Sequence, residues 1–392
     1  MKQISENLLY IGVDDKTLDL FESQYPIPEG MSYNSYLLSA GKTAIMDSVD
    51  SRCQDQWLSN LEEALGGRTP DYLVVHHMEP DHSGSIARVM EKYPSLVLVA
   101  SAKALSMLGQ FFPEADFTSR TLAVKEGDVI DLDGRTLTFY GAPMVHWPEV
   151  MVSFDNAGGV LFSADAFGKF GALELCGYFG EEESDWACEA RRYYFNICGK
   201  YGTPVQTLLG KIKKLDVRVI APLHGPVLRK ALEQYLELYD IWSKYEAEKP
   251  GVLVCHASIH GGTAQAATAL ASMIEACGQR VKVVDVARME VSELIEDAFS
   301  YDKVVLAAAS YDGGLFPPMA NFIHHLQDKA WQKRRVGLVE NGSWAPCAGR
   351  IMRDLLSGLK NIDIVEPMVT IRSRATAADM AALQALAKEI SK

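Results

Sequence analysis

Closely spaced cysteines are missing from this sequence. Its seven cysteines are scattered along 392 residues, and no two of them form a Cys-x-x-Cys pair. Zinc ribbons, iron–sulfur clusters and rubredoxin-type iron sites need such pairs, so the sequence argues against all three. An odd number of dispersed cysteines is typical of a reducing compartment, where disulfides do not persist. We therefore expect a cytoplasmic protein.

Long hydrophobic runs and an excess of positive charge are missing as well. No apolar stretch approaches the roughly 20 residues of a membrane-spanning helix, and residues 1–12 lack the apolar core of a signal peptide. The net charge is −13 at pH 7, which disfavours nonspecific binding to nucleic acid. We expect neither a membrane nor a nucleic acid as a partner.

The length of the chain and a change of pattern near residue 250 predict two domains. Residues 1–249 contain many short strand-like segments punctuated by turns, and then a few helical ones, among them a stretch over 184–213. Residues 250–392 alternate strand and helix about five times, and their strands are apolar throughout, as a parallel sheet covered on both faces requires. This predicts a doubly wound α/β domain. Its strands are expected at 252–255, 281–286, 304–308, 336–339 and 362–365.

One stretch of the first domain concentrates side chains that bind metals. Four of them fall within six positions: His77, Glu79, Asp81 and His82. They follow an apolar strand at 72–75, and Pro80 and Gly84 predict a loop rather than a helix across the cluster. Imidazole and carboxylate ligands together suit iron, manganese or zinc.

Three further candidate ligands stand at or just past the ends of later apolar runs: His146, Asp165 and His224. A single histidine is more often structural, but the first 250 residues contain only five, and only His76 falls outside these contexts. If the runs are neighbouring strands, all seven side chains open on one edge of a layered sheet. The residues alone therefore predict one buried metal centre.

Three loops of the second domain predict a site for a phosphate and a flat ring. The first strand runs into a glycine-rich turn before a helix, where backbone N–H groups and hydroxyls can hold an anion: Ser258, His260, Gly261, Gly262 and Thr263. No Lys follows the glycines, so this is not a nucleoside-triphosphate loop, and flavin mononucleotide (FMN) fits better. The third and fourth strands end in the other candidates: Ser310, Tyr311, Asp312, Gly313 and Leu315, then Asn341, Gly342, Ser343 and Trp344. Either Tyr311 or Trp344 is available to stack on a flavin.

The metal motif resembles the metallo-β-lactamase superfamily, with one substitution. Hydrolases of that superfamily carry His-x-His-x-Asp-His, whereas this chain has His77-x-Glu79-x-Asp81-His82. The version with Glu is typical of flavodiiron proteins, and the resemblance extends over essentially the whole chain. It implies a metallo-β-lactamase-like αββα sandwich over residues 1–249 and a flavodoxin-like doubly wound parallel sheet over 250–392. It also implies that His77, Glu79 and His146 hold one iron, that Asp81, His82 and His224 hold the other, and that Asp165 bridges them.

The resemblance further implies an oxidoreductase that takes electrons from an external donor such as rubredoxin, a reductase or a reduced deazaflavin. FMN would pass them to the diiron site, where dioxygen is reduced to water or nitric oxide to nitrous oxide. Flavodiiron proteins pair head to tail, so a homodimer, or a tetramer of such dimers, is expected. Two other readings stay open at this stage: a zinc-dependent hydrolase fused to a flavodoxin-like domain, and an electron carrier with a structural first domain. The segment 33–36, Tyr-Asn-Ser-Tyr, matches a family motif and suits either strand packing or a role at the site.

Overall fold

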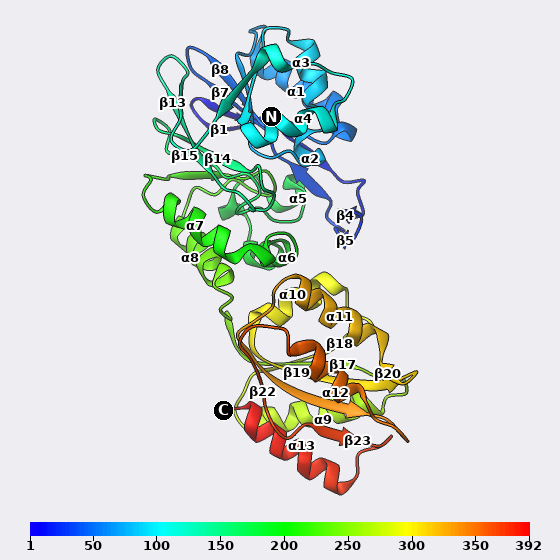
Figure 1. Cartoon of the computed structure of the whole chain (residues 1–392). Coiled ribbons are helices and arrows are strands. Elements are labelled where there is room, and N and C mark those ends of the chain that lie inside the picture. The colour runs from blue at the N-terminus through cyan, green and yellow to red at the C-terminus, as the bar shows by residue number, and fades with distance from the viewer. The chain divides into compact units, whose positions relative to one another are not determined.

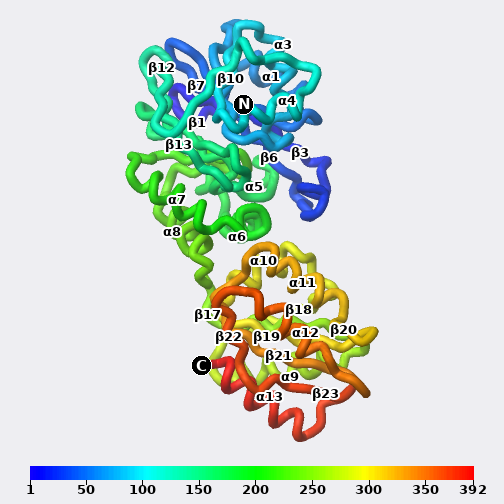
Figure 2. The backbone as a smooth tube through the Cα atoms, in the orientation of Figure 1, coloured from blue at the N-terminus to red at the C-terminus, as the bar shows by residue number.

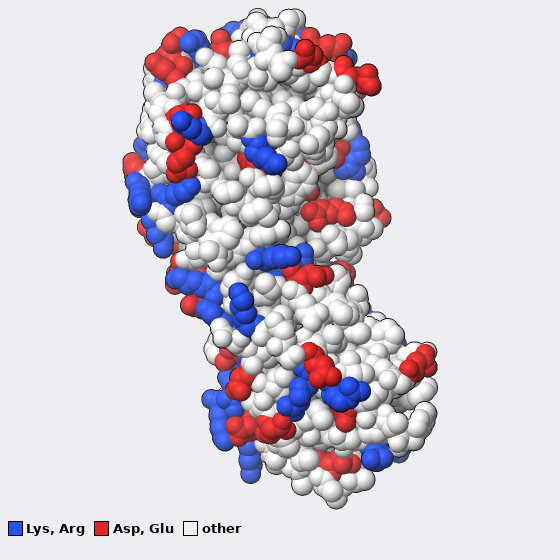
Figure 3. All heavy atoms as spheres, in the orientation of Figure 1, with Lys and Arg blue, Asp and Glu red and all other residues white.

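The structure, a computed structural model, describes residues 1–392 (Figure 1). The chain forms two compact units, residues 1–194 with 203–240 and residues 195–202 with 241–392. The two units divide near residue 240, so residues 241–249 belong to the second unit. The domain boundary near residue 250 stays a prediction. None of the helices combines the length and the apolar character that crossing a bilayer requires. On the face shown in Figure 3, basic and acidic side chains are interspersed.

Two sheets face each other in the first unit. Their inward side chains share one core, to which Leu38 and Val74 contribute from one sheet and Leu137 and Phe162 from the other. The larger sheet has the order β1 (Lys2–Ser5), β2 (Leu8–Tyr10), β7 (Tyr36–Ser39), β8 (Thr43–Met46), β9 (Tyr72–Val75), β10 (Val97–Ser101), β11 (Thr121–Val124). The smaller has the order β12 (Val129–Asp131), β13 (Thr136–Gly141), β14 (Met151–Asp155), β15 (Val160–Phe162), β16 (Val219–Ala221). Two short ribbons, β3 (Val13–Asp15) with β6 (Met31–Tyr33) and β4 (Leu20–Phe21) with β5 (Tyr25–Pro26), complete the strands.

Helices cover the outer faces of this sandwich, as the strands of the larger sheet require. The side chains of β8 are buried on both faces, so an element must lie on each side of it. Beside the larger sheet lie α1 (Gln54–Leu65), α3 (Ile86–Lys92) and α4 (Ala102–Phe111) (Figure 1). Beside the smaller lie α7 (Gly202–Ile212) and α8 (Leu232–Ser243). The predicted αββα sandwich is confirmed.

The second unit is a parallel sheet with helices on both faces, and Figure 2 traces its path. The strand order is β18 (Val281–Asp285), β17 (Lys249–Ala257), β19 (Tyr301–Tyr311), β21 (Arg334–Asn341), β22 (Ile362–Ile364), with β23 (Val369–Ile371) also paired to β21 and β20 (Gly314–Leu315) to β19. Val252 and Val254 of β17 pack against Leu270 and Leu386, which belong to α9 (Gly262–Ala276) and α13 (Ala377–Ile390). The other helices are α10 (Val291–Ser300), α11 (Pro317–Asp328) and α12 (Ala348–Leu356). This is the flavodoxin order of a doubly wound sheet, and the prediction is confirmed.

Two local predictions were wrong. A short helix, α2 (Pro80–Ser83), crosses the metal-binding cluster that we expected to be a loop. Pro80 stands in its first turn, where a missing N–H costs nothing, and Gly84 keeps a right-handed conformation that closes the turn. The helical stretch expected over 184–213 is interrupted between α6 (Trp186–Ile197) and α7 by a 3-10 turn at Gly199–Tyr201. Glycine lowers helix propensity at this break.

Contacts within the second unit predict which of two fragments is the more stable. Arg334 is 2% exposed and its Nη1 donates to the Tyr245 carbonyl at 2.7 Å, while the Tyr245 ring lies against Phe299. A fragment of residues 250–392 loses both contacts, although Nη1 of Arg334 keeps the carbonyls of Gln332 and Lys333 as acceptors. We therefore expect it to be less stable than residues 241–392 by about 1–3 kcal/mol, the net contribution of one charge-assisted hydrogen bond. Urea unfolding of the two fragments measures the difference. Equal unfolding midpoints would place these contacts outside the cooperative unit.

Candidate metal centre

All seven predicted ligands lie together in the interior of the first unit, in two adjacent groups. The first group contains His77, Glu79, His146 and Asp165; the second contains Asp81, His82 and His224. Within each group the atoms available as ligands lie within 4.8 Å of one another. Only Glu79 is partly exposed, and the other six residues are buried.

The ends of the strands bring these residues to one place. His77 and Glu79 follow β9, and Asp81 and His82 stand on α2. Asp165 and His224 follow β15 and β16, which are parallel neighbours, so their carboxyl ends meet at one edge. His146 differs from our expectation: β13 ends at Gly141, and His146 lies in the connection to β14 rather than at the end of a strand.

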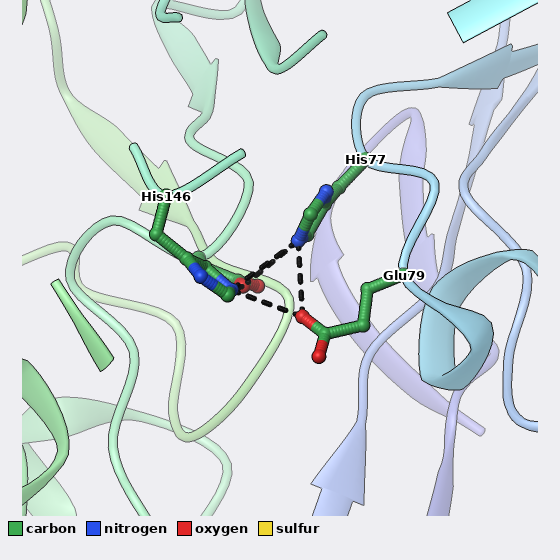
Figure 4. Close-up of side chains that lie close together, drawn as sticks. His77, Glu79 and His146 are labelled. Carbon is green, nitrogen blue, oxygen red and sulfur yellow. Dashed lines mark hydrogen bonds and ion pairs between the residues drawn. The ribbon is translucent and has the colours of Figure 1, made fainter. Parts of the chain in front are cut away.

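Three side chains of the first group, those of His77, Glu79 and His146, point toward one another (Figure 4). Oε2 of Glu79 lies 3.2 Å from Nε2 of His77 and 3.0 Å from Nε2 of His146. Oδ2 of Asp165 lies 3.2 Å from the same His146 nitrogen. Ligand atoms bound to one metal at about 2.1 Å are about 3 Å apart, so these separations fit a shared ion.

Asp165 stands between the two groups. Its Oδ2 faces the first group, and its Oδ1 lies 3.1 Å from Nε2 of His82 in the second. Oδ2 of Asp81 lies 3.2 Å from Nε2 of His224 and 3.5 Å from Nε2 of His82. One carboxylate therefore presents an oxygen to each group.

The second group contains buried polar atoms with no hydrogen-bond partner in the protein. They are both carboxylate oxygens of Asp81, both ring nitrogens of His82 and Nε2 of His224, and the same holds for Oδ1 of Asp165, the oxygen of the first group that faces them. Buried polar atoms are rarely left unpaired, because each one costs free energy of desolvation. Metal coordination would satisfy these atoms, so the residues fit a cation.

The local charges favour protonated histidines when no metal is bound. Burial alone lowers the pKa of His146, but the carboxylates of Asp165 and Glu79 raise it to about 9. Burial likewise opposes the charged form of His77, and Asp165, Glu149 and Glu79 together raise its pKa well above the usual range. A metal must displace these protons before it can bind.

Positioning residues absent from our sequence predictions hold two of the ligands. Oε1 of the buried Glu149 accepts a hydrogen bond from Nδ1 of His77 at 2.7 Å, and the Ser32 carbonyl accepts one from Nδ1 of His224 at 2.7 Å. Each bond leaves Nε2 free to bind a metal. His76 instead bonds Asp47 and Ser153, which accounts for it as a structural residue.

The Tyr-Asn-Ser-Tyr segment is a clamp on the loop that carries His224. The Asn34 side chain donates to the carbonyls of Pro222 at 2.8 Å and Gly225 at 2.7 Å, and the Tyr36 hydroxyl also donates to Pro222 at 2.8 Å. These atoms are buried, so the contacts fix where the loop leaves β16. The motif therefore acts through the backbone around His224.

The candidate flavin residues lie at one edge of the second unit. β17, β19 and β21 are parallel neighbours, so the loops after them meet. α9 begins without a side-chain cap, which leaves the N–H groups of its first turn open to an anion. A Cβ at Gly262 would stand 2.4 Å from the Ser373 carbonyl, so only glycine fits there.

The fourteen predicted flavin residues differ in their surroundings. Trp344 and Tyr311 are 88% and 44% exposed, as a ring that stacks on a ligand would be. Thr263 and Leu315 are buried, and the Ser310 hydroxyl accepts from the N–H groups of Cys347 and Ala348, so it shapes the loop before α12. The other predicted residues lie on the same loops or at the adjoining ends of α9 and β21: Ser258, His260, Gly261, Gly262, Asp312, Gly313, Asn341, Gly342 and Ser343.

Sequence reasoning missed a fourth loop, which follows β23. Ser373 exchanges hydrogen bonds with the Asn341 side chain, and its hydroxyl lies 2.7 Å from that of Ser343. No local motif distinguishes this loop, and only the pairing of β23 with β21 brings it to the site.

The raised histidine pKa values predict that metal binding releases protons. Affinity for a divalent ion should increase as pH rises from neutrality toward about 9, where His146 loses its proton. Calorimetric titration in buffers of different ionisation enthalpy counts the protons released. An affinity that does not change over this pH range would contradict the prediction.

The clamp predicts a coupled loss of stability and metal binding. Asn34→Ala leaves one buried carbonyl without its donor and should lower the free energy of unfolding by about 1–3 kcal/mol. It should also weaken the metal equivalent held by the second group. Tyr36→Phe is the matched control, because Asn34 still donates to the Pro222 carbonyl. Urea unfolding and metal titration of both variants test this, and equal effects would exclude a clamp centred on Asn34.

Comparisons with known proteins agree with this arrangement. The family model described as ODP family beta lactamase matches residues 31–225, and a flavodoxin domain model matches residues 253–357. An anaerobic nitric oxide reductase flavorubredoxin from Vibrio vulnificus is 28% identical over 350 residues, covering 87% of this chain and 70% of the relative. A namesake from Escherichia coli is 27% identical over 350 residues, covering 87% and 72%.

Solved structures share the fold over the whole chain. The rubredoxin oxygen:oxidoreductase of Desulfovibrio gigas aligns with a TM-score of 0.93 at 23% identity and covers 100% of this chain and 97% of its own. The flavodiiron protein of Giardia intestinalis aligns with a TM-score of 0.91 at 20% identity, covering 100% and 95%. These comparisons show that this chain joins an ODP-type beta lactamase domain to a flavodoxin domain, is similar to proteins named flavorubredoxin, and has the fold of flavodiiron proteins.

Proposed function

We propose that this chain is a flavodiiron protein, an oxidoreductase that passes electrons from an external donor through FMN to a non-haem diiron site. There it reduces dioxygen to water, nitric oxide to nitrous oxide, or both. The observation that carries the proposal is the position of Asp165, one carboxylate with an oxygen directed at each of two buried ligand groups. Relatives named as a nitric oxide reductase and as an oxygen:oxidoreductase support both gases as substrates.

The donor set favours iron over zinc. Three of the seven candidate ligands are carboxylates, those of Glu79, Asp81 and Asp165. Hard anionic oxygens of this kind stabilise ferric iron. In the proposed assignment, His77, Glu79 and His146 hold one iron, Asp81, His82 and His224 hold the other, and Asp165 bridges them. Two irons held there would supply electrons for the reduction of a diatomic gas. The zinc hydrolase reading has no observation in its favour.

The second unit offers the features that FMN needs. The open N–H groups at the start of α9 suit a phosphate, and Gly262 lets the loop that carries Ser373 pack closely against the start of this helix. FMN accepts electrons singly or in pairs and passes them on. We propose rubredoxin, a reductase or a reduced deazaflavin as the electron donor.

We also propose a head-to-tail homodimer, or a tetramer built from such dimers, located in the cytoplasm. Electron tunnelling falls off steeply with distance, so the flavin must come close to the irons. In the family the flavin of one chain approaches the irons of its partner, and a stable pairing of this kind needs a large symmetric interface.

Because Asp165 faces both ligand groups, its removal should weaken the binding of both metals. Asp165→Ala should lose most of both irons, and with them turnover of dioxygen and of nitric oxide under one fixed donor. Asp155→Asn is the control, because it changes a buried carboxylate that pairs with Arg135 outside both groups. Metal analysis and gas consumption provide the readouts. Stoichiometric zinc without iron in wild-type protein from iron-replete cells would refute the diiron proposal.

The head-to-tail arrangement predicts that two defective chains complement each other. One chain carries His82→Ala at the irons, and the other carries Gly261→Asp, which adds negative charge at the proposed phosphate site. Gly261 has a φ of +85° and open space around it, and Asp tolerates this conformation better than most residues. Gly261→Asn is the neutral control and should bind FMN more tightly than Gly261→Asp.

Neither defective parent should turn over, whereas mixed dimers should regain measurable activity through one intact path between chains. If heterodimers form, keep their remaining cofactors and stay inactive, electron transfer runs within a chain.

A further inference from the structure

Glu149 is a buried carboxylate that belongs to neither ligand group. It is 2% exposed, and its Oε1 accepts hydrogen bonds from Nδ1 of His77 at 2.7 Å and from the Met78 N–H at 2.9 Å. The Ser101 hydroxyl donates to its backbone carbonyl at 2.8 Å and so holds the residue in place. Two donors on one oxygen favour the ionised carboxylate. His77 therefore has a fixed anion behind it.

The corresponding histidine of the second group has a neutral partner. Nδ1 of His224 donates to the Ser32 carbonyl at 2.7 Å, and this carbonyl carries no net charge. Both histidines are fully buried, so solvent screens neither partner. The two ligand groups thus differ by one negative charge placed directly behind a ligand.

We propose that Glu149 is a positioning residue that makes the two halves of the metal centre unequal. The inference rests on the proposed diiron function. A carboxylate on Nδ1 strengthens Nε2 as a donor, because it stabilises positive charge on the ring as the ring gives electron density to a metal. The first group then binds its metal more tightly and holds the oxidised state more strongly than the second group does.

A purely structural role for Glu149 is the competing explanation, and the amide variant separates the two. Glu149→Gln keeps the shape and an oxygen that can accept both hydrogen bonds, but it removes the charge. Glu149→Ala removes the acceptor as well. A structural role needs the hydrogen bonds alone, whereas our proposal needs the charge.

The experiment uses the full-length protein loaded with iron. In Glu149→Gln both iron equivalents should remain, and one of the two midpoint potentials of the metal centre should rise while the other stays unchanged. Potentiometric titration followed by electron paramagnetic resonance measures both. In Glu149→Ala, chelator competition should show one equivalent weakened by about 10–100-fold, the usual cost of losing such a partner.

Asp47→Asn is the matched control. Asp47 is fully buried and its carboxylate contacts His76, which belongs to neither group. The variant removes the same charge from the same kind of pair without touching a ligand. It should leave both potentials and both affinities unchanged.

Several results would overturn the proposal: both potentials of Glu149→Gln unchanged, both shifted alike, or an equal shift in Asp47→Asn. If a variant does not retain iron, titration with Co²⁺ alone is the test. A role confined to the first group predicts weaker binding of one Co²⁺ equivalent. Unchanged binding of both equivalents, or weaker binding of both, would contradict it. Wild-type protein that fails to hold two irons would instead refute the proposed function, so the two failures are distinguishable.

Discussion

The charge of Glu79, Asp81 and Asp165 is the constraint on which the first unit depends. These carboxylates lie among buried histidines, and Asp81 and Asp165 keep oxygens with no hydrogen-bond partner in the protein. Desolvation makes such charge costly unless cations or protons balance it. The raised histidine pKa values show protons in that role when no metal is bound. The buried carboxylates therefore make this a site for cations, whatever reaction takes place there.

The sandwich holds this charge in a defined geometry. Adjacent parallel strands, β15 and β16, deliver Asp165 and His224 to one edge, and β9 delivers the cluster that begins at His77. The Asn34 clamp then fixes the loop that carries His224 through backbone carbonyls. Because these contacts join segments far apart in the sequence, the ligand positions are a property of the whole core.

The second unit uses backbone groups where the first uses side chains. Its candidate flavin site consists of the open start of α9, a glycine that accepts no side chain, and loops tied together by Asn341, Ser343 and Ser373. Such a site suits a ligand held by a phosphate and a flat ring. The two units therefore provide separate sites for separate parts of one electron path.

Residue types and spacing determined much of this protein. The crowding of His77, Glu79, Asp81 and His82, and the positions of His146, Asp165 and His224 near apolar runs, identified all seven side chains that the structure groups. The apolar strands after residue 250 likewise determined the parallel sheet, because burial on both faces leaves a distinct pattern. The division into two groups and the place of Asp165 between them came from the family resemblance and not from spacing, and the structure groups the residues in the same way. Tertiary structure alone decided the partners Glu149, Ser32 and Ser373. Ser32 acts through a backbone carbonyl, which every residue carries, and Glu149 and Ser373 reach their partners only through the fold, so no local pattern of side chains marks these three residues.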